Sequence, residues 1–186
     1  MPQKRGSLSA DLRFLQNLAY LVPGYRAYRD VALRRGEDSR LRARVLAAIK
    51  ATRDRIHELQ ELWTAKEVDP RWTELLAGGI RELSRLAEEL RYCPAQSEAF
   101  FSIPKLPTDL IDELLEADLL VLGDLEHLGR AVDALPENPP RRKGMRRMLG
   151  DVHGGLQDLA GHLLHRDAVL SRLDDMTESA AAPLAA

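Results

Sequence analysis

Acidic and histidine side chains recur in this chain at the spacing that places metal ligands on one face of a helix. They are Asp54, His57, Asp124, His127, Asp158, His162 and His165. A helical bundle can hold two metal ions when Glu-x-x-His pairs and further carboxylates all point inward. Here the helical phase directs His57 and His127 to the flank or the outside, and His162 with His165 is expected on a solvated face. The sequence therefore predicts no metal site and no cofactor, with a bundle that holds a metal or small ligand as the alternative.

Other catalytic signatures are missing from the sequence. It contains no Ser-His-Asp set and no His-Glu-x-x-His motif. The glycine pairs at 78–79 and 154–155 lack the following Lys-Ser or Lys-Thr that a phosphate-binding loop needs. A non-enzymatic protein is therefore favoured.

Asp118 is the most unusual single residue. It falls in the apolar stripe of a predicted helix, between Leu115 and Leu122. An acidic side chain in such a stripe is costly unless it is paired. We expect a buried ion pair with an arginine from the N-terminal third. The alternatives are a partly exposed edge position and a catalytic carboxylate.

Charge is distributed unevenly along the chain. Residues 1–60 carry a net charge of +7, residues 61–140 carry −10 and residues 141–186 carry +1, although the whole chain has a net charge of only −2. Such asymmetry favours docking surfaces. Nucleic acid is a disfavoured partner, because the acidic middle would repel the phosphate backbone.

Apolar periodicity of about 3.6 residues predicts an all-α fold, an antiparallel bundle of about four long helices plus a short N-terminal amphipathic helix. The segments end at Pro and Gly residues and span 8–22, 25–67, 70–92, 108–134 and 141–175. The predicted organisation is an N-terminal helix and Pro-Gly turn over 1–24, a bundle domain over 25–176 and a disordered tail over 177–186. Phe100 and Phe101 lie in a Pro-rich connection and are expected to close one end of the core.

The single cysteine, Cys93, excludes an intrachain disulfide and favours a reducing cytoplasm. Polar residues interrupt the first apolar stretch, so neither a secretory leader nor a spanning helix is expected. The predicted location is cytoplasmic, with the inner face of the membrane as an alternative.

Two surfaces are predicted to bind a partner. The first combines the apolar face of the N-terminal helix with an arginine stripe and comprises Leu12, Leu15, Leu18, Val22, Tyr25, Arg26, Arg29, Arg40 and Arg44. The second is a basic cluster at a helix start, comprising Arg141, Arg142, Lys143, Arg146 and Arg147. Such clusters can contact an acidic protein face, anionic lipids or phosphates, or can simply be solvated. We expect the N-terminal helix to pack on something outside its own bundle, with intramolecular packing as the alternative.

Two stretches resemble a group of uncharacterised bacterial all-helical proteins. Residues 21–29, LVPGYRAYR, resemble the group's LPGYRGYR opening, and the Phe100-Phe101 pair with residues 110–126 resembles its FF…LYEFDL block. Residues 95–97 and Pro104 depart from the usual loop of that block. The group has no established activity and is sometimes found with membrane-microdomain proteins of the band 7 type. The resemblance thus implies a helical fold and a possible membrane-proximal assembly.

Taken together, these features predict a non-enzymatic interaction or scaffold protein that binds another protein or a second copy of itself. An anionic membrane surface is an alternative partner. A nucleic-acid-associated regulator is a further alternative function.

Overall fold

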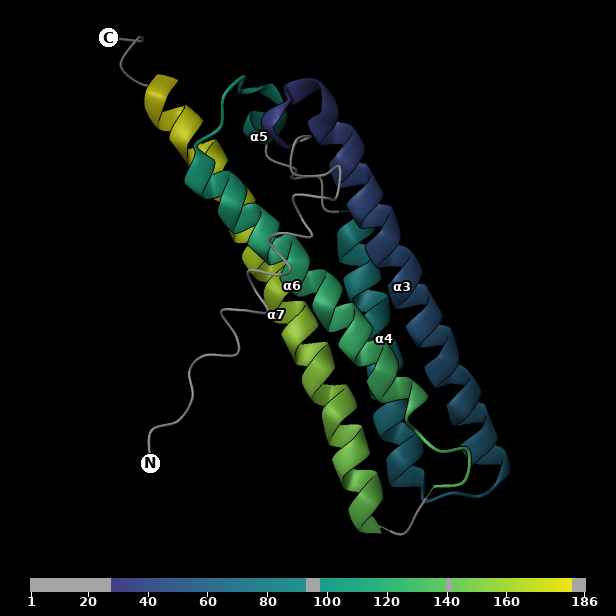
Figure 1. Cartoon of the computed structure of the whole chain (residues 1–186). Coiled ribbons are helices and arrows are strands. Elements are labelled where there is room, and N and C mark those ends of the chain that lie inside the picture. The colour runs from purple at the N-terminus through teal and green to yellow at the C-terminus, as the bar shows by residue number, and fades with distance from the viewer. Residues whose placement is uncertain (1–27, 93–97, 140–141, 182–186) are drawn as a thin grey trace, which may run out of the picture.

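The computed structural model describes residues 28–92, 98–139 and 142–181. All regular structure in these ranges is helical, which confirms the predicted all-α fold (Figure 1). The helices are α3 (Val31–Ala65), α4 (Pro70–Tyr92), α5 (Glu98–Ser102), α6 (Thr108–Asp133) and α7 (Arg142–Ala181). None of them is long and apolar enough to cross a membrane.

Helix starts follow from local capping. The backbone of Asp30 is extended, and its carboxylate accepts a hydrogen bond from the Ala32 amide, so α3 begins at Val31 and not at the predicted residue 25. Asp69 caps α4 in the same way by accepting from the Arg71 amide at 3.1 Å. Pro70 then occupies the first helical position, where its missing N–H costs nothing.

Two features differ from the predicted segments. A five-residue helix, α5, forms within the Pro-rich connection, for which no helix is predicted. α7 continues to Ala181 and so includes residues 177–181, which were assigned to the tail. Alanine is the strongest helix former, and Pro183 is the first residue beyond this stretch that cannot continue a helix.

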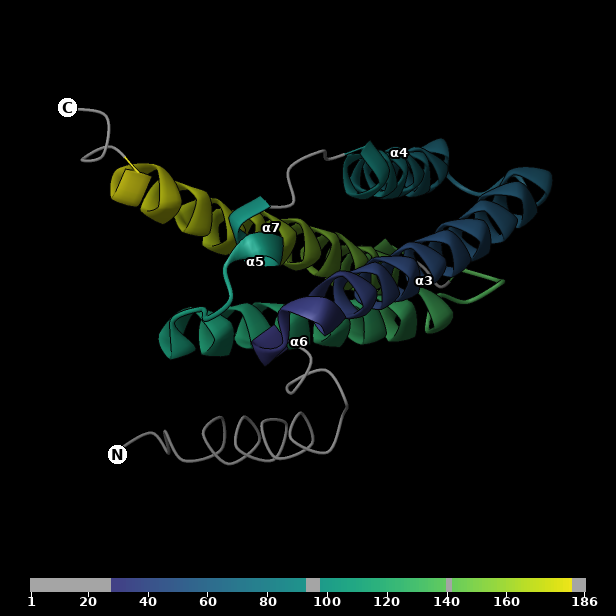
Figure 2. The same cartoon turned by 90° about the horizontal axis from the view of Figure 1, so that it is seen from above.

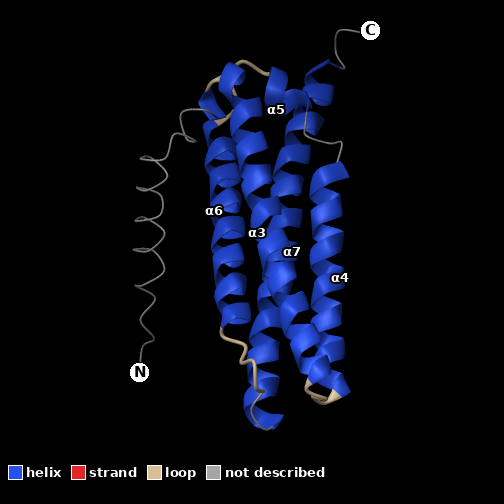
Figure 3. Cartoon of the chain, turned by 90° about the vertical axis from the view of Figure 1, so that its right-hand side faces the viewer, coloured by secondary structure: helices blue, strands red, loops and turns tan. Residues whose placement is uncertain are grey.

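The four long helices run alternately in opposite directions. α6 packs along α7, α3 packs along α4 and α3 also contacts α6, whereas α4 meets α7 only sparsely. Seen from above and from the side, α4 and α6 lie on opposite sides of the assembly (Figures 2 and 3). The seam between α4 and α7 is therefore the loosest junction of the bundle.

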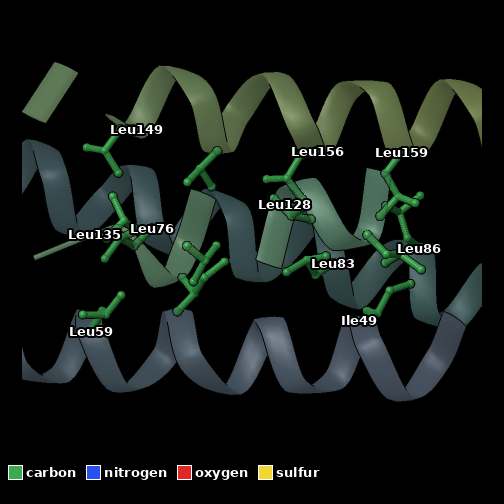
Figure 4. Close-up of a cluster of buried hydrophobic side chains, with 14 of the residues drawn as sticks. Ile49, Leu59, Leu76, Leu83, Leu86, Leu128, Leu135, Leu149, Leu156 and Leu159 are labelled. Carbon is green, nitrogen blue, oxygen red and sulfur yellow. The ribbon is translucent and has the colours of Figure 1, made fainter. Parts of the chain in front are cut away.

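The apolar core forms two clusters. The larger one joins leucines, isoleucines and valines of α3, α4, α6 and α7, several of which face one another in Figure 4. The smaller one surrounds α5 and includes Tyr28, Phe100 and Phe101, so the two phenylalanines close one end of the core as expected. The Tyr28 and Phe100 rings meet edge to face at 5.6 Å.

Gly79 of α4 is buried and faces both α3 and α7. A Cβ at this position would lie 3.5 Å from Leu156 and 3.7 Å from Ile56, which is ordinary van der Waals contact. Leu75 of the same helix is 54% exposed, because it lies at the open edge of α4 toward α7.

Several predicted features lie outside the described residues. These are the helix over 8–22 with its Pro-Gly turn, and the residues Leu12, Leu15, Leu18, Val22, Tyr25, Arg26 and Arg141. The side chains of Arg142 and Lys143 also lie outside the described part.

Candidate functional site

A buried charged cluster forms around Asp118. One carboxylate oxygen accepts a hydrogen bond from Arg166 Nε at 2.6 Å, and the other accepts one from the Tyr28 hydroxyl at 2.6 Å. The aspartate is 6% exposed and the arginine 3%. The predicted pairing with an arginine of the N-terminal third is wrong, because α7 runs along α6 over its whole length and brings Arg166 alongside.

Asp38 and Arg42 of α3 complete the charged cluster. Arg166 Nη2 donates to Asp38 at 2.6 Å, and Arg42 Nε donates to the other Asp38 oxygen at 3.0 Å. Arg42 also donates to the carbonyl oxygen of Leu90, which ties α3 to the end of α4. Two carboxylates and two guanidinium groups thus balance, so the buried cluster has no net charge.

The charged cluster separates the two apolar clusters. On α6 and α7, the smaller cluster lies on one side of Asp118 or Arg166, and the larger cluster lies on the other. On α3, the larger cluster begins beyond Asp38, and Tyr28 of the smaller cluster precedes the helix. Burial raises the pKa of Asp118, while Arg166 and the Tyr28 hydroxyl act to lower it. Burial and the neighbouring Asp118 carboxylate raise the pKa of Tyr28, so its hydroxyl stays protonated and donates.

Arg34 is a second buried arginine and binds only backbone oxygens. Its Nε donates to the carbonyl of Tyr28 at 2.6 Å, and its Nη1 donates to the carbonyls of Phe100 and Ile103 at 2.9 and 2.7 Å. Among the described residues, none accepts a hydrogen bond from its Nη2. This side chain therefore fastens the start of α3 to α5 and the loop that follows it.

The sequence contains a signal for these buried charges beyond Asp118. Arg34 and Asp38 share the apolar phase of Val45 and Ile49 on α3, and Arg166 shares that of the α7 leucines. The prediction from sequence covers only Asp118. Arg34, Asp38 and Arg166 carry the same signal, a charged residue at an apolar position of a helix.

The α6–α7 seam holds further ionic contacts in antiparallel register. His162 Nδ1 lies 2.5 Å from Asp124, and Arg172 lies 2.5 Å from Glu113. Two other ligand-like residues pair with neighbours on their own helix: Asp54 contacts Lys50, and His57 contacts Glu61. Among the described residues, no three His, Cys, Asp or Glu side chains gather as metal ligands.

Three members of the predicted arginine stripe lie in the described part of the chain. Arg40 and Arg44 are exposed one turn apart on α3, and Arg40 pairs with Glu37. Arg29 is exposed but precedes α3, because the chain is extended at Asp30. Arg146 and Arg147 are exposed near the start of α7.

The loose seam between α4 and α7 contains two adjoining grooves. One has a volume of about 670 Å³ and is lined by Leu75, Gly78 and His153 among others. The other has a volume of about 780 Å³ and is lined by Tyr92, Leu164 and the same Ala160 that borders the first groove. Together they extend along one side of the bundle.

Exposed apolar side chains concentrate at these grooves. Four large hydrophobic residues of the described part are exposed: Leu33, Leu75, Tyr92 and Leu164. Leu75, Tyr92 and Leu164 are 54%, 76% and 73% exposed and line one groove or the other. Apolar residues grouped in this way mark interaction sites more often than single ones do.

The hydroxyl of Tyr28 gives a first test of the buried charged cluster. We expect Tyr28→Phe to lower the free energy of unfolding by roughly 1.5–3 kcal/mol, because the charged carboxylate of Asp118 loses the hydrogen bond that the Tyr28 hydroxyl donates. The ring contact with Phe100 stays. Urea unfolding followed by circular dichroism measures this. An unchanged midpoint would mean that the hydrogen bond contributes nothing to stability.

Comparison with known proteins adds no further assignment: no family model matches this chain, and no curated protein or solved structure matches it either.

Proposed function

We propose that this protein is a non-enzymatic interaction module that binds an α-helix of a protein partner on the face formed by α4 and α7. The observation that supports the proposal is the pair of adjoining grooves with exposed Leu75, Tyr92 and Leu164 along them. Helix-binding grooves recognise apolar side chains that recur along one face of a helix. A long groove between two helices suits such a ligand.

The buried charged cluster supports a structural role for the polar residues. Arg166, Asp38 and Asp118 are at most 6% exposed and are hydrogen-bonded to one another, so no substrate reaches them in this conformation. A cluster of this kind can fix the register of packed helices. The cluster would thereby fix the position of α7 along the bundle axis, and this position determines which residues of α7 line the grooves.

Site-specific photo-crosslinking in the native cell tests the proposal. A photoreactive benzoylphenylalanine replaces Leu75 or Leu164 at the grooves, or Glu58 on the exposed side of α3 as the matched control. We expect a discrete protein adduct from the two groove positions and none from position 58. Equal or absent crosslinking at all three positions would contradict the proposed docking face.

A further inference from the structure

Three glycines of helix α7 pack against nothing in the described part of the chain. A Cβ added to Gly150, Gly154 or Gly161 would meet no atom of the described residues within 4 Å. By contrast, a Cβ on Gly155 would lie 3.4 Å from Leu128, so that glycine serves the contact with α6. Glycine weakens a helix interior relative to alanine. The three open glycines are therefore unfavourable for the isolated bundle.

These glycines belong to one continuous face of α7. At about 100° per residue, the face covers roughly 80° of the helix circumference and extends for about 27 Å. Its residues are Gly150, Gly154, Gln157, Gly161, Leu164 and Ala168. We call this set the glycine face.

The glycine face is uncharged and borders both grooves. None of its six residues has a formal charge, although 30% of the chain is charged. Gln157 lines the first groove, and Gly161 and Leu164 line the second. On the α4 rim, Arg81 and Arg85 lie among four glutamates. Three of these glutamates form ion pairs with the two arginines, which reduces the repulsion that the rim would exert on an identical surface.

We infer that the helix bound by this face is α7 of a second copy of the chain, packed antiparallel about a two-fold axis. This inference rests on the proposed helix-docking function. A two-fold interface requires a self-complementary patch. The glycine face meets this requirement. Along the helix axis, Leu164 protrudes on the C-terminal side of the centre of the face, and the groove beside His153 lies on the N-terminal side.

The register of the pairing follows from these two features. We place Leu164 of each copy in the groove of its partner, at the level of His153. The two-fold axis then lies beside α7 at the level between Asp158 and Leu159, because that level is halfway between positions 153 and 164. The glycines and Ala168 then lie on both sides of the crossing and let the two helix backbones approach closely. Leu164 would also approach the exposed Leu75 of the other copy.

The double substitution Gly154→Ala and Gly161→Ala tests this interface. In the isolated bundle the new methyl groups meet open space, so the melting temperature should rise. In the dimer they would separate the helices and weaken dimerisation by about tenfold or more. Sedimentation equilibrium of the full chain measures the dissociation constant.

Gly123→Ala on α6 is the matched control. Its Cβ also meets open space, but it lies outside the glycine face. We expect the control to raise the melting temperature and leave dimerisation unchanged. The inference is overturned if the wild-type chain stays monomeric at high micromolar concentration, or if the double variant associates as well as wild type. A monomeric wild type that still crosslinks to another protein from positions 75 and 164 would leave the proposed function standing.

Discussion

Replacing Arg166 with methionine is expected to destabilise the protein by about 3–5 kcal/mol. The substitution leaves Asp118 with only the Tyr28 hydroxyl and Asp38 with only Arg42. The cluster would then contain two carboxylates and only one guanidinium group, that of Arg42, which binds Asp38. Chemical denaturation at neutral pH, followed by circular dichroism, measures the loss.

The pH dependence of this loss has a definite sign. Burial raises the pKa of Asp118, and Arg166 opposes this rise. Without Arg166 the folded-state pKa lies further above the unfolded value. A group with a raised folded-state pKa favours folding at low pH and loses that contribution as the pH rises through its pKa. The deficit of Arg166→Met should therefore grow as the pH rises above the unfolded-state pKa of an aspartate, about 3.9.

A second substitution tests whether the effect is electrostatic. Adding Asp118→Asn to Arg166→Met removes one uncompensated carboxylate, and Asp38 keeps its pairing with Arg42. We expect the double variant to be more stable than Arg166→Met alone. Simple addition of the two single losses would contradict a charge-balanced cluster.

Replacing Arg34 with methionine is expected to cost about 3 kcal/mol or more. The buried carbonyl oxygens of Tyr28 and Phe100 and the partly buried one of Ile103 lose their donor at once. Hydrogen exchange should also become faster in α5, because this arginine fastens α5 to the start of α3. Urea unfolding and exchange mass spectrometry measure the two effects.

The neighbouring Arg35 provides a matched control. Its guanidinium lies 4.7 Å from the centre of the Phe101 ring, but the residue is exposed. Arg35→Met removes the same charge from the same turn and should cost no more than about 1 kcal/mol. Similar losses for the two variants would show that backbone bonding by Arg34 is unimportant.

The helices could be predicted from sequence because their signals are local. Asp69-Pro70 marks the start of α4, Pro107 stands at the N-cap of α6, and the apolar spacing continues to each end. The start of α3 was misplaced because the Arg-rich sequence around Asp30 is compatible with one uninterrupted helix. Its cap depends on the extended backbone of a single residue.

The buried site could be predicted only in part because it depends on tertiary pairing. Helical phase places Asp118 inside, but phase alone does not say which helix supplies its partner. Arg166 is 48 positions away, and the antiparallel packing of α6 on α7 brings it into contact. The open seam also escapes prediction, since Leu75 has the same local pattern as the buried leucines of α4 and differs only in what lies opposite.

Distance measurement between spin labels tests most directly the central claim, that α7 pairs with α7 of a second copy. In a chain with its single cysteine, Cys93, replaced by serine, labels are placed through Gln157→Cys near the proposed axis or Arg146→Cys far from it. The antiparallel register predicts backbone separations between copies of roughly 8–12 Å at position 157 and about 37 Å at position 146. Absence of any intermolecular dipolar coupling, or a shorter distance at 146 than at 157, would contradict this pairing.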